Sequence, residues 1–330
     1  IVSVCGFSLG LGCLLMSQIG AIWQLYVFFG LLVGIGLSGA YTPLLPTVGR
    51  WFVRRRGMMT GIASAGAGVG TVIMPPLVAW LISVYHWRTA SIIVGITNLV
   101  LIILAAQFFK RDPGKMGLSP YGGSEIEKDK IDLEAGSFSV KQATHTRQFW
   151  LLCGMFACNL LTVGIVLVHV IIHATSLGMP AIGAANIIAL AGVGGIVGQI
   201  VLASAGDRIG NKSATITGFI LLTAALFWLM AAKEMWALYL FGAVFGFASQ
   251  GLLALMPPMA AELFGLGALG VLTGIVSASG SIGEATGSVL AGGIFDMTGS
   301  YQWAFLLCAG ISIMGIIFSS LLRPIKGKLS

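Results

Sequence analysis

Charged residues are scarce in this chain of 330 residues: they make up 9% of it, whereas 57% of the residues are hydrophobic. The mean hydropathy is +0.97. So little charge excludes a soluble domain, which needs a charged surface. It also excludes a nucleic-acid-binding face, which needs basic and aromatic residues on one soluble surface. The 5 cysteines all fall within apolar runs, so they predict neither a disulfide framework nor a metal site.

The charges are clustered and leave apolar runs of about 20 residues between them, the length that crosses a bilayer as a helix. The runs lack the alternation of transmembrane strands. The sequence therefore predicts an all-α polytopic membrane protein. The expected helices cover 1–20, 24–47, 57–83, 88–109, 149–174, 181–204, 213–232, 236–257, 267–292 and 302–323.

Basic residues are divided unequally between the two sets of alternate loops. One set of loops and ends holds 16 of the 18 Lys and Arg, and the other holds only Arg88 and Lys233. The positive-inside rule places the first set, with both ends of the chain, in the cytoplasm. The net charge of +7 follows from this topology. We expect a multi-pass protein of the plasma (inner) membrane, in contact with the lipid bilayer and not with nucleic acid.

The sequence contains an internal repeat. GMMTGIASAGAGVG (57–70) and GVLTGIVSASGSIG (270–283) match at a constant offset of 213, and the likeness continues on both sides, as in HWRTA (86–90) and YQWAF (301–305). Such a repeat in a membrane chain predicts two half-domains of like fold with a substrate site between them.

The offset also predicts the domain organisation. It pairs the run 1–20 with 213–232, so 149–174 and 181–204 have no counterpart in the first copy. We therefore expect two further helices upstream, and ten of twelve transmembrane helices here. The expected parts are the remainder of the N-terminal half (1–109, helices 3–6), a cytoplasmic linker (110–148) and a C-terminal six-helix half (149–330). Within the linker, 124–135 could form a short surface helix.

The loop GDRIGNK (206–212) between two predicted helices resembles the G-x-x-x-D-R-x-G-R/K signature of the major facilitator superfamily. A carboxylate such as Asp207 can lie near the positive end of a helix dipole, and Arg208 can pair with another helix end. Such contacts would lock one state of a rocking molecule. The alternative is a charged turn that only sets topology. The candidate gating residues in this loop are Gly206, Asp207, Arg208, Gly210 and Lys212.

The segment RWFVRRRGMMTGIASAGAGVGTVIMPP (50–76) resembles the monocarboxylate transporter and oxalate–formate antiporter branch of that superfamily, as do 167–179 and 262–305. Arg54, Arg55 and Arg56 belong to this second candidate gating motif. The resemblance implies the major facilitator fold and transport by alternating access. It implies no cofactor, and we expect neither a cofactor nor a metal. We expect a monomer.

Ionisable side chains at membrane depth are costly and point to function. Glu284 lies near the middle of 267–292, where its repeat counterpart is Thr71, so the shared scaffold does not require a carboxylate there. It is a candidate for proton coupling or substrate binding; a Glu hydrogen-bonded between helices is the alternative. His169 is a second candidate, since a histidine can titrate and can donate to an anion; an interfacial histidine satisfied by backbone or water is the alternative. Tyr41, before Pro43, is a third.

Three amides complete the candidates: Gln199, Asn159 and Gln250. Helix–helix hydrogen bonds would explain them equally well. The resemblance implies a cationic residue at the position of Gln199, and 267–292 contains no Lys or Arg. A carboxylate would therefore have to be held by uncharged donors, by a protonated histidine or by helix N-termini.

The expected function is secondary active transport of a small organic anion, monocarboxylate-like, by proton symport or exchange. Transport of a neutral or other small molecule is the alternative, and so is a non-transporting sensor or scaffold. A membrane enzyme would need a catalytic constellation, and none is recognisable. A nucleotide-binding loop of the G-x-x-x-x-G-K-[ST] type is absent from the sequence, which leaves ATP-driven pumping unsupported.

Overall fold

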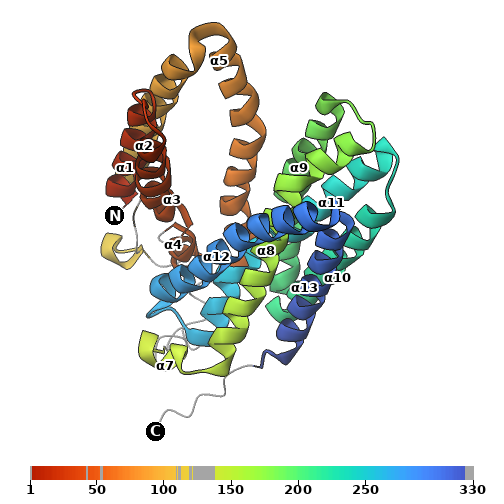
Figure 1. The fold of residues 1–330 in the computed structure, drawn as a ribbon. Helices are drawn as coiled ribbons and strands as arrows, with labels where there is room; N and C mark the ends of the chain where they lie inside the picture. The colour runs from red at the N-terminus through yellow and green to blue at the C-terminus, as the bar shows by residue number, and fades with distance from the viewer. Residues whose placement is uncertain are drawn as a thin grey trace. The chain divides into compact units, whose positions relative to one another are not determined.

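The computed structural model describes residues 2–41, 44–52, 55–108, 110, 113–118, 121 and 138–323, and every structural statement below refers to these. Within them the chain forms helices joined by turns and short irregular segments, with an isolated bridge between Phe52 and Tyr121. It forms two compact units, one of residues 1–51 with 70–120 and the other of 52–69 with 121–330. Figure 1 labels the helices. The predicted helix at 124–135 lies outside the described residues, as does Arg54.

The first unit contains α1 (Val2–Met16), α2 (Ile22–Leu25), the π-helix η1 (Tyr26–Val33), α3 (Gly34–Tyr41), α4 (Leu44–Trp51) and most of α5 (Arg56–Phe108). α5 is broken at His86, whose backbone has φ 70° and ψ 151°. The His86 Nδ1 accepts a hydrogen bond of 3.0 Å from the Trp87 N–H, which caps the restarted helix. This break lies between the two runs predicted at 57–83 and 88–109.

The second unit contains the first turns of α5 and the remaining long helices. These are α8 (Arg147–Ser176), α9 (Ala181–Ile209), α10 (Asn211–Ala231), α11 (Met235–Phe264), α12 (Leu269–Thr298) and α13 (Gln302–Leu321). The short α7 (Val140–Thr144) precedes them and begins with a capping box between Ser139 and Gln142. Each long helix covers most of a predicted run, and the largest differences are at the ends of α11 and α12, which continue past 257 to Phe264 and past 292 to Thr298.

Glycines set how closely these helices cross. On α9, Gly194 and Gly198 lie against the carbonyl oxygens of Ala243 and Phe247 of α11, where an added Cβ would overlap the backbone. α8 and α12 meet in the same way, with Gly164 against the carbonyl oxygen of Glu284. Small residues at a crossing let backbones approach within van der Waals contact, which is a main source of association between helices in lipid.

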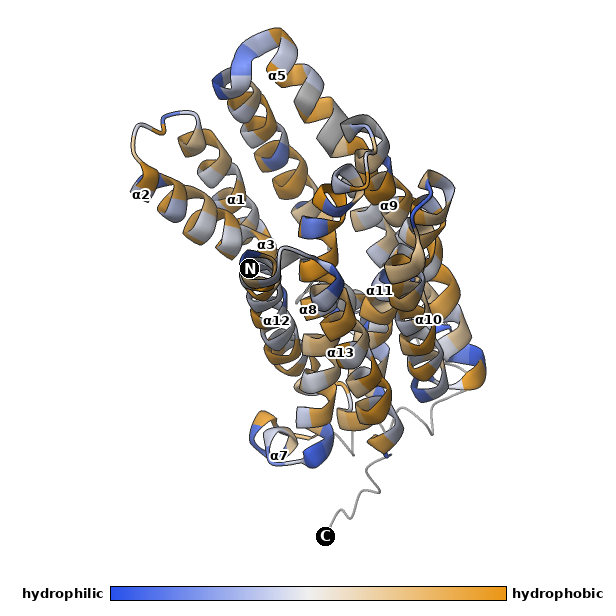
Figure 2. Cartoon of the chain, turned by 45° about the vertical axis from the view of Figure 1, so that its right-hand side comes forward, coloured by the Kyte–Doolittle hydropathy of each residue, from blue (hydrophilic) through white to orange (hydrophobic). Residues whose placement is uncertain are grey.

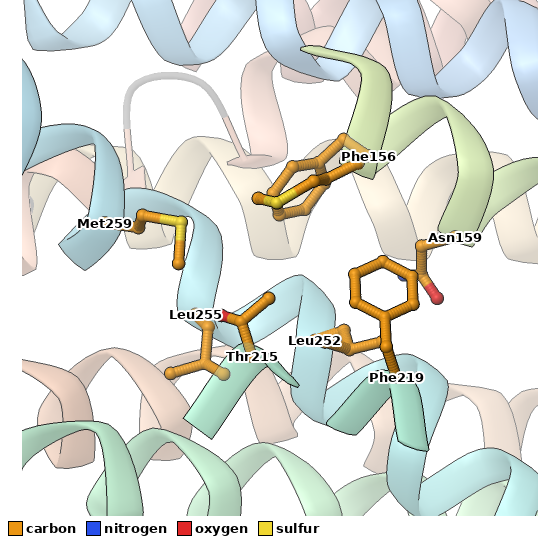
Figure 3. Close-up of a pocket in the computed structure, with 8 residues that line it drawn as sticks. Phe156, Asn159, Thr215, Phe219, Leu252, Leu255 and Met259 are labelled. Carbon is orange, nitrogen blue, oxygen red and sulfur yellow. The ribbon is translucent and has the colours of Figure 1, made fainter. Parts of the chain in front are cut away.

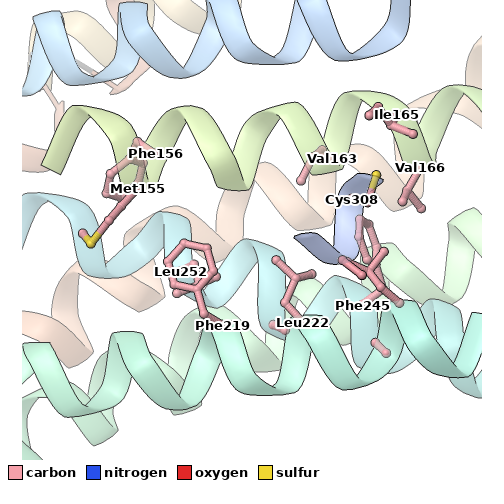
Figure 4. Packing of buried hydrophobic residues seen from close by; sticks show 14 of the residues in the cluster. Met155, Phe156, Val163, Ile165, Val166, Phe219, Leu222, Phe245, Leu252 and Cys308 are labelled. Atoms are coloured by element: carbon pink, nitrogen blue, oxygen red, sulfur yellow. The ribbon is translucent and has the colours of Figure 1, made fainter. Parts of the chain in front are cut away.

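The apolar core of the second unit lies where α8, α10, α11 and α13 meet. Figure 4 shows Met155 and Phe156 of α8 near Phe219 and Leu252, with Val163 and Val166 of α8 farther along beside Cys308. Phe219, Phe245 and Leu222 are each no more than 1% exposed. Dense packing here holds the polar side chains of the same helices in fixed positions.

The long helices are coloured largely as hydrophobic residues in Figure 2, which is typical of membrane spans. Among the described residues, 7 segments are long and apolar enough to cross a membrane, including Trp80–Phe108, Arg147–Ser176 and Met235–Phe264. α12 is outside this set because glycines, serines and Glu284 lower its mean hydropathy.

Candidate gating and substrate site

The Asp207 carboxylate, near the end of α9, binds the beginning of α5. Its Oδ1 accepts a hydrogen bond from the Gly57 N–H and its Oδ2 one from the Met58 N–H, each 2.8 Å long. The first N–H groups of a helix have no partner within it and carry its positive dipole end. A carboxylate bound there is the arrangement predicted for Asp207.

Close packing makes this contact possible. Gly57 lies against the carbonyl oxygen of Ala203, and a Cβ on Gly57 would be 2.7 Å from Asp207 Oδ1. One helical turn later, Gly61 lies against the carbonyl oxygen of Gln199. Any larger side chain at these glycines would push α5 off α9 and break the hydrogen bonds to Asp207.

Two other residues of the 206–212 loop hold further helix ends. The Lys212 Nζ donates to the carbonyl oxygens of Ser320 and Leu322 at the end of α13, at 2.7 Å each. The Asn211 Nδ2 donates to Glu262 Oε2 at 2.8 Å, near the end of α11. An ammonium group on the last carbonyls of a helix is stabilising, because that end carries the negative pole.

The two glycines of the loop have different roles. Gly210 has φ 88°, a conformation that L side chains rarely adopt. Gly206 is buried, and a Cβ there would be 2.6 Å from Asn211 Oδ1. The loop therefore needs glycine at both positions to place Asp207 and Lys212 on opposite helix ends.

The arginines predicted to take part in gating are placed only in part. Arg208 is exposed and makes no hydrogen bond or ion pair with any residue that the structure describes. Arg55 is exposed, with φ 58°. Arg56 begins α5, and its side chain is outside the description, like all of Arg54.

Gln199 and Gln250 meet between α9 and α11. The Gln199 Nε2 donates to Gln250 Oε1 at 3.3 Å, and Gln199 is only 1% exposed. Its Oε1 is buried without a partner. Ser64, on the face of α5 that also carries Gly61, likewise has a buried Oγ without a partner. Unmatched buried polar atoms are costly, so this region of α5, α9 and α11 offers hydrogen-bonding capacity that the described protein leaves unused.

Asn159 of α8 contacts α11 at the residue before Gln250. Its Nδ2 donates to the carbonyl oxygen of Ser249 at 3.1 Å, whereas its Oδ1 is buried without a partner. It borders a cavity of about 10 Å³ whose other lining residues include Phe156, Thr215 and Phe219 (Figure 3). A space of this size holds at most one water molecule, so it is no substrate chamber in this conformation.

His169 and Glu284 lie at the crossing of α8 and α12. The His169 Nε2 is 3.2 Å from the carbonyl oxygen of Ser288, and its Nδ1 is buried without a partner. The ring lies 5.0 Å from that of Tyr301. The Glu284 carbonyl oxygen contacts Gly164, but the side chain is exposed and its carboxylate makes no hydrogen bond with a described residue. Among the described residues, the exposed Glu284 side chain therefore takes no part in the contact between α8 and α12.

The structure therefore groups the predicted residues unevenly. It joins Gln199 to Gln250 and places Asn159 beside Ser249, the neighbour of Gln250; His169 and Glu284 belong to a separate crossing. Tyr41 ends α3, but its side chain is outside the description. Sequence reasoning missed Ser64, Asn211 and Glu262. The identity of Ser64 and Ser277 in the repeat is the signal that could have pointed to the first.

The comparisons with known proteins identify the class. A family model described as Major Facilitator Superfamily matches residues 1–203 and 152–330, so the chain belongs to this superfamily. It is an integral membrane transporter of a small molecule and not an enzyme.

Two relatives show the branch that the chain resembles. Monocarboxylate transporter 13 of Bos taurus is 29% identical over 319 residues, which cover 94% of this chain and 70% of the relative. Monocarboxylate transporter 12 of Rattus norvegicus is 29% identical over 336 residues, with coverage of 94% and 68%. The predicted resemblance to monocarboxylate transporters is confirmed.

Solved structures share the fold. The human organic anion transporter MFSD10 (TETRAN) has a TM-score of 0.71 at 13% identity, covering 96% of this chain and 76% of its own. The E. coli fucose:proton symporter FucP has a TM-score of 0.68 at 18% identity, covering 97% and 82%. At these identities the likeness concerns the fold alone.

Proposed function

We propose that the protein is a secondary active transporter that moves a small organic anion, monocarboxylate-like, by proton symport or exchange. It works by alternating access between an N-terminal half (1–109) and a C-terminal half (149–330) joined by a linker. It resides in the plasma membrane as a monomer with both ends of this chain in the cytoplasm, as the distribution of basic residues favours.

The observation that carries the proposal is the pair of hydrogen bonds from Gly57 and Met58 to Asp207. These bonds join segments that belong to different proposed halves. Each bond is 2.8 Å long, and a carboxylate at an exposed helix N-terminus contributes only about 1 kcal/mol, so the contact can form and break readily. Contacts of this strength suit a lock that forms in one state and opens in the other.

The nature of the substrate rests on resemblance and on the unpaired polar atoms. Gln199, Asn159 and His169 each leave one buried atom without a partner. Each of these atoms could accept a hydrogen bond, and a carboxylic acid carried with its proton could donate one to any of them. Glu284 and His169 are the proposed proton carriers, and Tyr41 and the amides the proposed substrate contacts.

One observation favours a second candidate, a neutral substrate. Every Lys and Arg between residues 148 and 323 lies at or beyond a helix end, namely Arg208, Lys212, Lys233 and Arg323. These helices therefore offer no fixed cation at membrane depth to hold an anion. A polar, uncharged compound that hydrogen-bonds to Gln199 and Gln250 would need none.

Transport by the purified full-length protein in proteoliposomes distinguishes these candidates. Labelled lactate, pyruvate and oxalate are offered with and without an inward proton gradient, with empty liposomes as the control. The proposal predicts saturable uptake of at least one acid that increases with the gradient. Uptake of none of them, by protein that remains monodisperse, would reject the anion and direct the search to neutral compounds.

A further inference from the structure

The first unit contains a hollow of about 280 Å³ where α1 ends and α5 restarts after His86. It is lined by Ser17, Gln18, Arg88, Thr89 and Ile92. Close contacts hold its two walls together. Gly10 lies against Leu99, and a Cβ added at Gly95 would be 3.0 Å from Leu14. The two helices therefore run antiparallel, and the end of α1 stays beside the first turn of 87–108.

No described carboxylate pairs with Arg88 in this hollow. Residues 1–111 contain no Asp or Glu, and Arg88 forms no ion pair with any described residue. Its guanidinium carbon lies 4.8 Å from the centre of the Trp87 ring, so the ring holds the cation in place.

The position of Arg88 is also unfavourable for the helix itself. It lies in the first turn after the break, where the positive end of the dipole disfavours a cation and favours an anion. In the repeat, the residue after Trp303 is Ala304, so the scaffold does not require a charge there. The arginine and the helix start together define a site for an oxyanion.

An apolar stripe begins directly below this site. Ile92, Ile96, Val100 and Leu104 recur every four residues on one face of α5 and are 37%, 51%, 45% and 54% exposed. They extend over about 18 Å of helix, the reach of an acyl chain in one leaflet. Trp80 and Tyr85, both exposed, lie before the same break, as aromatic residues do at a membrane interface.

We propose that this is a phospholipid-binding site. The lipid phosphate occupies the hollow beside Arg88, Gln18 and Thr89, and one acyl chain lies along the stripe from Ile92 to Leu104. A free anion would occupy the hollow alone, whereas a phospholipid held there by its phosphate would also place its acyl chain on the stripe. Because Arg88 belongs to the poorer set of basic loops, the lipid belongs to the outer leaflet. This inference does not depend on which substrate is carried.

Native mass spectrometry of the delipidated full-length protein, titrated with palmitoyl-oleoyl phosphatidylglycerol, tests the site. Arg88→Gln should weaken the tightest lipid adduct about fivefold, the contribution of one cation at a membrane surface. Lys233→Gln removes the other exposed cation of the same loop set and should leave that adduct unchanged. Equal lipid retention by wild type and Arg88→Gln would overturn the proposal.

Two further arms separate the sources of the anion. The double variant Ile96→Ala with Val100→Ala removes apolar surface from the middle of the stripe but keeps Arg88. This variant should also weaken the phosphatidylglycerol adduct. It tests the site even if Arg88→Gln does not fold. Inorganic phosphate and lactate are titrated in the absence of lipid. Binding of either one at Arg88 as tightly as phosphatidylglycerol would show a free-anion site and overturn the lipid assignment.

Discussion

At the scale of single residues, function depends on a few polar atoms in an apolar chain. Asp207 finds its partners on the main chain of α5, so the contact needs no matching cation. Gln199, Asn159 and His169 each have one hydrogen-bonded side-chain nitrogen and one buried polar atom left over. A transporter must bind its substrate and release it, and half-satisfied side chains suit both steps.

Asp207→Asn keeps the size of the side chain but removes its charge and one of the two acceptors. The bonded state should lose about 1 kcal/mol, the scale of a charge at a helix N-terminus. We therefore expect a shift of roughly fivefold toward the unlocked state and a lower maximal rate of uptake, at unchanged expression. Asp207→Glu, which keeps the charge, should restore part of the rate; an Asn variant with wild-type kinetics would remove Asp207 from gating.

Glu284→Gln should reduce uptake driven by a pH gradient while leaving folding intact, because the exposed amide fits where the carboxylate lies but cannot carry a proton. Uptake at several gradients and thermal unfolding measure the two effects separately. Asp296→Asn, a change at another exposed acid of α12, serves as the matched control. Unchanged gradient dependence in Glu284→Gln would exclude this residue from coupling.

At the scale of helices, glycine contacts decide which polar residues meet. Gly198 against Phe247 and Gly194 against Ala243 set the register of α9 on α11, and this register brings Gln199 to Gln250. The crossing of α8 and α12 is built in the same way around Gly164. Helix register is thus a consequence of small residues and not of the polar contacts themselves.

Gly198→Ala should destabilise the protein by about 1–3 kcal/mol, because the new methyl group overlaps the Phe247 carbonyl and α9 cannot move away from a packed core. Gly292→Ala is the control, since a Cβ there meets nothing within 4 Å. Thermal unfolding in one detergent compares them. A melting temperature for Gly198→Ala equal to that of Gly292→Ala would contradict the account of the α9–α11 crossing.

The sequence predicted the helices well and their contacts poorly. The length of an apolar run fixes a span, so α8 and α13 fall close to their predicted ranges, and the break at His86 falls between two runs. The run 24–47 contains the π-helix η1 between α2 and α3, which hydropathy cannot reveal because it does not distinguish helix types. Asp207 was expected at a helix start, but its partners Gly57 and Met58 depend on tertiary packing. The same holds for the pairing of Gln199 with Gln250.

At the scale of the whole molecule, the account requires a transporter with a fixed orientation and two alternating states. The superfamily is shown by a match along the chain. The orientation follows from the division of 16 basic residues against 2 and remains a prediction.

Lys233→Cys should react with a membrane-impermeant maleimide added to whole cells, and Arg208→Cys should react only after the membrane is opened. Both positions are exposed, so access to the residue does not limit labelling. The five native cysteines are replaced by serine or alanine in both variants. Labelling of Arg208→Cys in intact cells would reverse the proposed topology.

The most direct test of the central claim is the separation between the start of α5 and the end of α9 in the full-length protein. Spin labels at Arg55→Cys and Arg208→Cys, both exposed positions, report this separation by pulsed electron–electron double resonance. The protein lacks its native cysteines and is reconstituted in nanodiscs. The account predicts two populations, a short one with the Asp207 contact formed and a longer one without it. It also predicts that Asp207→Asn increases the longer population. A single distance that neither Asp207→Asn nor a transported substrate changes would contradict alternating access through this contact.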